Sequence, residues 1–216
     1  MKLRHLTALA LLGATAAQAA DSAFHDEAAF LLNAGNVAFE SFETLAARSR
    51  SLDPIATTRF TISTGGAPIG VQTGADTPDA GFGSAAVDGT HYISVYLPGL
   101  PQGSIRFDLA APSHAFGLYL TDAGEADGQI TFQTNAGAFS TTLVVGEAPP
   151  LLPNGNVRFI GFTQDQAFTQ VTLTVTGIDD AYGVDKVYVG AVPEPSSALL
   201  LGLGLAGIAA ARLRRR

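Results

Sequence analysis

The chain reads Val171-Thr172-Leu173-Thr174-Val175-Thr176 over one stretch, and apolar and polar side chains alternate through all of it. Successive side chains of a β-strand point to opposite faces, so this pattern predicts a strand with one buried and one solvent-facing side. Similar short runs, separated by turn residues, recur along most of the chain. The predicted strands are Val37–Glu43, Thr57–Ser63, Tyr92–Leu97, Ser104–Leu109, Ala115–Thr121, Gln129–Thr134, Ala138–Val145, Arg158–Phe162, Phe168–Thr176 and Val184–Val189.

Turn residues lie between these strands. Asp88-Gly89 and Asp127-Gly128 favour tight hairpins, and Asn135-Ala136-Gly137 suits a three-residue hairpin. Short strands with close turns predict an all-β fold, an antiparallel β-sandwich that is jelly-roll-like. Gly65–Gly89 and Glu147–Gly155 are rich in turn residues and are expected to be loops, with weak edge strands as the alternative for the first.

One short helix is expected ahead of the strands, over Asp21–Asn36. Phe24, Ala28 and Leu31 recur near helical spacing, acidic residues lie in the first turn, and Gly35 can end the helix.

The last 25 residues combine a rigid motif, an apolar segment and a basic cluster. Val192-Pro193-Glu194-Pro195 is held extended by its prolines. Ser196–Ala211 is uncharged and spans about 24 Å as a helix, which is short for a bilayer. Four of the residues in Arg212–Arg216 are arginines, which predicts a cytoplasmic C-terminus. The alternatives are a buried core helix and a plain membrane anchor.

This tail resembles that of the PEP-CTERM family of sorted bacterial proteins. The resemblance rests on the motif at 192–195, the membrane span at 196–211 and the basic tail at 212–216. It implies that the chain is a substrate of an exosortase, a membrane transpeptidase of Gram-negative bacteria that make extracellular polysaccharide. It also implies that Pro193, Glu194 and Pro195 form the sorting recognition element.

The beginning of the chain has the pattern of a signal peptide. Lys2, Arg4 and His5 precede an apolar run, Leu6–Ala17. Ala17 and Ala19 supply the small residues that signal peptidase recognises, so cleavage is expected after Ala19 or, as second choice, after Ala20. An uncleaved anchor is the alternative. The expected organisation is a signal peptide over 1–20, an exported β-sandwich domain over 21–191 and a sorting signal over 192–216.

Composition excludes several kinds of chemistry. The chain has no cysteine, which excludes disulfides, zinc–thiolate sites and a cysteine nucleophile. The net charge is −7, but the domain over 21–191 has 18 acidic against 6 basic residues, or −12. Such a surface repels nucleic acid and anionic lipid, so no nucleic-acid partner is expected.

The sequence does not select an active site. It has neither the Gly-x-Ser-x-Gly nucleophile motif nor two histidines at the spacing of zinc proteases. The four strand-associated carboxylates could include a catalytic pair, but nothing in their spacing selects two; they are Glu40, Glu43, Asp108 and Asp122. Tyr92, Tyr96 and Tyr119 could present a sugar-stacking face, although the chain has no tryptophan.

A second resemblance, to exported domains that bear this tail, covers most of the chain. It is carried by the opening helix, by Phe39-Glu40-Ser41-Phe42 and by Tyr182-Gly183-Val184-Asp185-Lys186-Val187. It implies a sandwich of the kind found in carbohydrate-binding modules, with a structural calcium ion that links Glu40 to Asp185. Carboxylate oxygens suit calcium. The acidic turn Asp122–Gly128 is another candidate, and solvated carboxylates are the alternative.

Three functions follow as hypotheses. The first is a non-catalytic exported protein that is held in the inner membrane by its tail and then sorted to the cell surface or polysaccharide matrix. Signal peptidase, exosortase and the membrane are its expected partners. The second is a carbohydrate-binding module that contacts exopolysaccharide, and the third is a polysaccharide-degrading enzyme.

Overall fold

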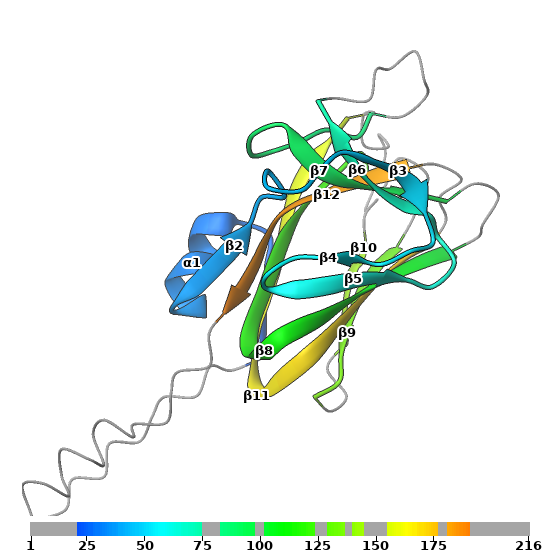
Figure 1. The fold of residues 1–216 in the computed structure, drawn as a ribbon. Helices are drawn as coiled ribbons and strands as arrows, with labels where there is room; N and C mark the ends of the chain where they lie inside the picture. Colours follow the sequence, from blue (N-terminus) through cyan, green and yellow to red (C-terminus); the bar gives the residue numbers. More distant parts are fainter. Residues whose placement is uncertain are drawn as a thin grey trace, which may run out of the picture.

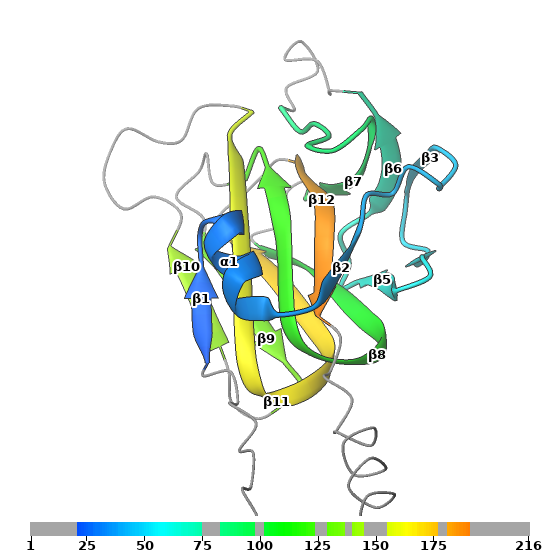
Figure 2. The same cartoon turned by 90° about the vertical axis from the view of Figure 1, so that its left-hand side faces the viewer.

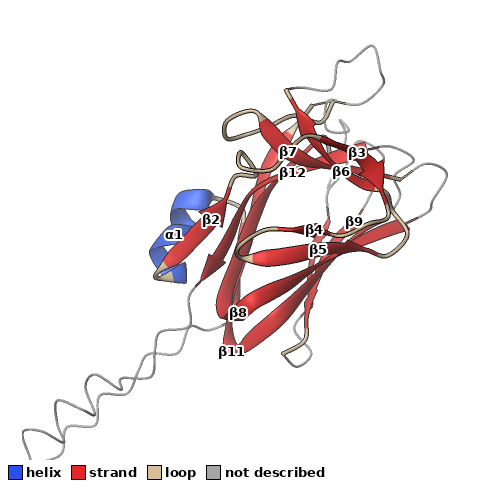
Figure 3. Ribbon diagram, viewed as in Figure 1, coloured by secondary structure: helices blue, strands red, loops and turns tan. Residues whose placement is uncertain are grey.

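The computed structural model describes residues 21–74, 83–97, 102–123, 129–136, 140–144, 155–176 and 181–190. The elements are β1 (Ser22–Phe24), α1 (Glu27–Ala34), β2 (Val37–Glu40), β3 (Arg48–Ser51), β4 (Ile55–Ala56), β5 (Phe60–Thr64), β6 (Ile69–Thr73), β7 (His91–Tyr96), β8 (Gln102–Thr121), β9 (Gln129–Thr134), β10 (Ser140–Val144), β11 (Val157–Thr176) and β12 (Ala181–Gly190). Figures 1 and 3 show a mostly β molecule with a single short helix among these residues. All strand pairs are antiparallel and belong to one 12-stranded sheet within the described residues, which confirms the predicted all-β, antiparallel class.

Two long neighbouring strands organise this sheet. β8 and β11 each have 20 residues and pair along most of their length, but both curve round in the middle (Figures 1 and 2). The register shifts between Thr163 and Phe168 of β11, where β8 passes through Pro112. We call residues 110–114 of β8 and 164–167 of β11 the bend. Pro112 has no N–H to donate, and it lies where the ladder is already interrupted.

The bend folds the single sheet into two layers. Layer A contains β4, β5, the first half of β8, the second half of β11, β9 and β10, paired in that order. Layer B contains β1, the first half of β11, the second half of β8, β12, β7, β6 and β3, and β2 also pairs with β12.

Aromatic side chains fill the space between the layers. Phe107 of layer A and Phe116 of layer B have ring centroids 5.1 Å apart, and Phe116 also packs against Phe162 at 5.9 Å. Both strands place alternate residues on this side, so the period-2 pattern of the sequence becomes the core. Phe132 joins the same cluster, and all four rings are buried.

A second, smaller cluster lies on the outer side of layer B, under α1. Phe30 of the helix packs against Phe159 at 5.4 Å, and Tyr188 lies beside both. Phe159 therefore belongs to the helix-covered face rather than to the core between the layers. Glycine at position 161 leaves room for the ring of Phe30, because a Cβ there would lie 2.7 Å from its Cδ2.

The helix is shorter than expected. It begins after the N-cap Asp26, whose carboxylate accepts a hydrogen bond from the N–H of Ala29 at 2.8 Å, and it ends before Gly35, which has φ 69°. Residues 22–24 form β1 on the edge of β11 instead of a first helical turn. Pairing with an existing strand satisfies their backbone groups, which helical spacing alone could not reveal.

Other boundaries also differ from the expectation. The predicted strands at 104–109 and 115–121 are one strand, β8, and those at 158–162 and 168–176 are one strand, β11. Besides β1, the short strands β3 and β4 were not predicted, and β6 lies in the stretch Gly65–Gly89, for which weak edge strands were the alternative to a loop. The predicted turn at 127–128 lies outside the described residues. Within the described part of the chain, no helix is both long enough and apolar enough to cross a bilayer.

Candidate functional site

The predicted sorting and processing residues lie outside the part of the chain that the structure describes. These are Ala17, Ala19, Pro193, Glu194 and Pro195. The predicted calcium ligands Glu40 and Asp185 are described, and they lie on neighbouring strands, because Glu40 of β2 pairs with Val187 of β12.

Asp185 is buried, and its carboxylate accepts three backbone hydrogen bonds. Its Oδ2 accepts from the N–H groups of Val87 at 2.7 Å and Asp88 at 2.8 Å, and its Oδ1 accepts from the N–H of Lys186 at 2.6 Å. Burial raises the pKa of Asp185 to about 6 even though these bonds act to lower it. Asp185 thus holds the segment before β7 against the outer side of layer B.

Glu40 has a separate contact. Its Oε1 accepts a hydrogen bond from the N–H of Phe42 at 3.0 Å, where Phe42 takes the left-handed conformation with φ 62°. Among the described residues, no three His, Asp or Glu side chains gather closely enough to hold a metal ion. A cation between Glu40 and Asp185 would therefore need further ligands such as backbone carbonyls.

Two of the other strand-associated carboxylates also hold the backbone. The Oε1 atom of Glu43 accepts from the N–H groups of Thr90 at 2.7 Å and His91 at 2.5 Å, and these bonds lower the pKa of Glu43 to about 2. Asp122 accepts from the N–H groups of Gly83 at 2.6 Å and Gly155 at 2.7 Å. These contacts give both carboxylates a structural role.

A cluster that the sequence did not predict joins α1 to layer B. The Nζ of Lys186 lies 2.7 Å from Oε1 of Glu27, and the hydroxyl of Tyr119 donates to Oε2 of Glu27 at 2.8 Å. Tyr188 also donates to Glu27. The ammonium of Lys186 lies 5.7–5.8 Å from the centroids of Phe39, Tyr119 and Tyr188. Partial burial disfavours the charged forms of Glu27 and Lys186. The hydrogen bonds between these groups outweigh that effect, so the pKa of Glu27 is lowered and the pKa of Lys186 is raised.

The outer side of layer A carries polar side chains in register. One row crosses four strands as Ser63, Arg106, Thr172 and Gln133. The next row contains Thr61, Asp108 and Gln170, where Gln170 donates to Asp108 at 2.8 Å and Arg106 pairs with Asp108 at 3.0 Å. All seven side chains are exposed or half-buried.

A hollow of about 230 Å³ interrupts this polar face. It is lined by Gln133, Thr134, Asn135, Gln170 and Thr172. Amides and hydroxyls provide both donors and acceptors, so the hollow can hydrogen-bond a polyhydroxylated ligand. Sequence reasoning missed it because the rows form only when β5, β8, β11 and β9 align.

The tyrosines do not supply a stacking surface on this face. Tyr92 is buried, Tyr96 lies under Arg50 with the guanidinium carbon 5.4 Å from the ring centroid, and Tyr119 lies under α1. Of the three tyrosines that could present a sugar-stacking face, Tyr92 is therefore ruled out by its burial, and Tyr96 and Tyr119 are half-buried.

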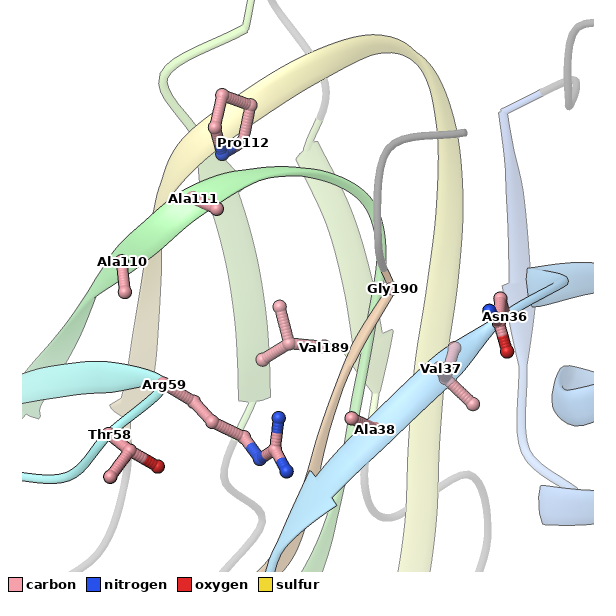
Figure 4. A pocket seen from close by; sticks show the side chains of 10 residues that line it. All are labelled: Asn36, Val37, Ala38, Thr58, Arg59, Ala110, Ala111, Pro112, Val189 and Gly190. Carbon is pink, nitrogen blue, oxygen red and sulfur yellow. The ribbon is translucent and has the colours of Figure 1, made fainter. Parts of the chain in front are cut away.

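A second hollow lies at the bend, beside the end of β12. It has a volume of about 310 Å³ and is lined largely by small apolar side chains (Figure 4). Its lining is Asn36, Val37, Ala38, Thr58, Arg59, Ala110, Ala111, Pro112, Val189 and Gly190. Arg59 is the one charged side chain among the described residues that line this hollow, and its Nε–H donates to the carbonyl of Phe39 at 3.1 Å.

Comparison with known proteins identifies the tail. Residues 191–216 match the PEP-CTERM protein-sorting motif, which confirms the sorting signal predicted from the sequence. A search of curated proteins found no match to the chain.

Several solved structures are similar at low identity. TmCBM61 in complex with β-1,4-galactotriose is 16% identical over 60% of this chain and 86% of its own, with a TM-score of 0.37. The K1 cleaved adhesin domain of Lys-gingipain from Porphyromonas gingivalis W83 is 13% identical over 73% of this chain and 99% of its own, with a TM-score of 0.45. A third similar structure is the family 11 carbohydrate-binding module from Clostridium thermocellum in complex with a β-1,3-1,4-mixed-linked tetrasaccharide. It is 12% identical over 69% of this chain and 99% of its own, with a TM-score of 0.35.

Proposed function

We propose that this protein is a non-catalytic exported protein that an exosortase sorts to the cell surface or the extracellular polysaccharide matrix. The observation that carries this proposal is the match of residues 191–216 to the PEP-CTERM sorting motif. Signal peptidase removes residues 1–19 or 1–20, and the apolar segment 196–211 then holds the chain in the inner membrane with its arginines in the cytoplasm. Exosortase recognises Pro193, Glu194 and Pro195.

The intact mass of the protein from its native cell tests this proposal. We expect a species that starts at Ala20 or Asp21 and ends near Pro195. Glu194→Ala should abolish this C-terminal processing, and Ser197→Ala, just outside the motif, should leave it unchanged. A wild-type chain that still ends at Arg216 would reduce the tail to a membrane anchor.

Carbohydrate binding is the second candidate, and the polar outer face of layer A favours it. The row of Arg106, Thr172 and Gln133 offers donors and acceptors along a line that crosses the strands, as an extended polysaccharide requires. We propose that exopolysaccharide contacts this face. The jelly-roll interpretation of the two-layered fold belongs to the same proposal.

Affinity electrophoresis or pulldown with extracellular polysaccharides tests this candidate. Gln133→Ala and Gln170→Ala should each weaken binding about fivefold, the equivalent of one neutral hydrogen bond near 1 kcal/mol. Gln166→Ala, at the bend and away from this face, is the matched control. If no polymer is retained by the unaltered protein, the sorting function stands without a carbohydrate-binding role.

We further propose a structural calcium ion at Glu40 and Asp185. A cation would compensate the charge that burial disfavours on Asp185, whose pKa is raised to about 6. Binding to the folded state alone would raise the melting temperature in millimolar calcium relative to EDTA. Equal melting temperatures in the two solutions would exclude the site.

A further inference from the structure

The first and last described strands meet the same end of layer B. Ser22 of β1 pairs with Thr163 of β11, and Thr163 pairs with Ala115 of β8. Gly190, at the end of β12, lies against the same alanine, because a Cβ on Gly190 would be 2.8 Å from the Cβ of Ala115. Ser113 donates to the carbonyl of Gly190 at 2.5 Å. The chain therefore enters and leaves the domain at the bend.

These two points are close together across the sheet. β1, β11, β8 and β12 are consecutive neighbours in layer B, so three strand spacings, or roughly 14 Å, separate Ser22 from Gly190. Figure 2 shows the start of β1 and the end of β12 at the same end of the molecule, where β8 and β11 curve.

Both connections to the apolar segments are short. Ser22 is five positions after Ala17, the end of the apolar run of the signal peptide, so this connection reaches at most about 18 Å. Ser196, the start of the apolar span, is six positions after Gly190, so this connection reaches at most about 22 Å. The far end of the domain, at Thr121 and Val157, lies six residues along the strands from the bend, or roughly 20 Å away.

We propose that the bend is the membrane-facing surface of the folded domain and that the precursor is tethered there by both of its ends. The proposal rests on the proposed function, because it takes residues 6–17 and 196–211 as membrane segments. If the far end faced the bilayer instead, both connections would have to run fully extended along the length of the domain to reach it. The two tethers therefore favour one orientation, and the far end points away from the bilayer.

The surface at the bend suits a position close to lipid. Ala110, Ala111 and Pro112 are exposed there, and they line the hollow of about 310 Å³ (Figure 4). These three side chains are small and uncharged, so headgroups can approach this part of the bend without desolvating a charge, whereas the exposed Asp165 of β11 and Arg59 of the hollow are charged. The domain as a whole is acidic and repelled by anionic lipid, so the tethers, rather than attraction, keep the bend at the bilayer.

The absence of cysteine from the chain permits a direct test. Gln166→Cys places a single thiol on an exposed position of the bend, and Val157→Cys places one on an exposed position at the far end, where Val157 is 55% exposed. Each full-length variant is labelled with a thiol-reactive fluorophore and reconstituted into vesicles of phosphatidylethanolamine and phosphatidylglycerol that contain a headgroup-attached quencher. Melting curves matched to the parent protein confirm that both variants are folded.

We expect loss of emission from the label on Gln166→Cys and no loss from the label on Val157→Cys. Equal quenching of both labels, stronger quenching at position 157, or no quenching of either on vesicle-bound protein would overturn the proposed orientation. Flotation of the vesicles separates this result from a failure of the proposed function. If the full-length protein does not float with the vesicles, residues 6–17 and 196–211 are not membrane segments, and the proposed function itself fails.

A second measurement tests whether the two membrane segments hold the bend at the bilayer. Removing residues 192–216 from a signal-processed chain should release the protein from the vesicles and abolish quenching at position 166, because tethering holds the bend at the lipid. Quenching that persists without either segment would show an intrinsic affinity of the domain for lipid and would overturn the tethering mechanism.

Discussion

Glu27 and Lys186 are 159 positions apart in the sequence, and their charged groups lie 2.7 Å apart in the folded protein. Glu27 is in the first turn of α1, whereas Lys186 lies at an irregularity of β12, with φ 47°. The same carboxylate accepts hydrogen bonds from Tyr119 and Tyr188. This relationship fastens the only described helix to layer B.

Removing the carboxylate should therefore destabilise the protein. We expect Glu27→Ala to lower the free energy of unfolding by about 1–3 kcal/mol, because Lys186 and two tyrosine hydroxyls lose a partly buried partner. Urea unfolding measures this change. The exposed Asp165→Ala is the control, and a loss as small as that of the control would show that solvent replaces the ion pair without cost.

Asp185 should make the protein less stable as the pH rises from about 4 to 6. Its pKa in the folded state is raised to about 6 by burial, against an ordinary value of 3.8, so the folded state binds a proton that the unfolded state has released. Stability contributed by this proton is present below pH 3.8 and is lost as the pH rises through 6. Asp185→Asn, measured by urea unfolding across this range in EDTA, should remove this slope even though it also lowers overall stability. Asp165→Asn should retain the slope.

Glu43 should give stability the opposite dependence on pH, and at lower pH values than Asp185. Its pKa is lowered to about 2 by the backbone N–H groups of His91 and Thr90, against an ordinary value of 4.5. Its contribution to stability is therefore present above pH 4.5 and is lost as the pH falls toward 2. Glu43→Gln should flatten the pH dependence of the melting temperature between pH 4.5 and 2. An unchanged acid limb in this variant would contradict the assignment.

Gly161 should tolerate no larger side chain while Phe30 is in place. A Cβ at position 161 would lie 2.7 Å from Cδ2 of Phe30 and 3.0 Å from Cε1 of Phe159. Gly161→Ala should therefore cost about 1–3 kcal/mol through displacement of α1. Chemical denaturation of Gly161→Ala, Phe30→Leu and the double variant tests this explanation: the double variant should lose less than the sum of the two, whereas simple additivity would show that the two sites do not interact.

The strand pattern could be predicted wherever one face of a strand is apolar. The alternation of Val171, Leu173 and Val175 with threonines predicts a buried face, and all three side chains are buried in the structure. The continuity of β8 through Pro112 could not be predicted, because a proline ends a strand unless the hydrogen-bonded ladder is already interrupted there. β1, β3 and β4 were missed for a related reason: short strands depend on the neighbours that pair with them.

The candidate sites divide in the same way. The sorting motif is a local pattern at 192–216, so it could be identified from the sequence and is confirmed by the comparison of residues 191–216. The polar rows on layer A combine residues from β5, β8, β11 and β9, and no local pattern joins Ser63 to Gln133. The cluster of Glu27, Lys186 and Tyr119 was missed for the same reason.

The sequence by itself determined the sorting signal and the all-β class, because a peptide motif and the alternation of side chains are properties of neighbouring residues. Only the tertiary structure decided where the carboxylates act, which face stays open and where the chain enters and leaves the domain. These features depend on strand register across the bend, and register is set by long-range pairing and by burial of the two apolar faces against each other.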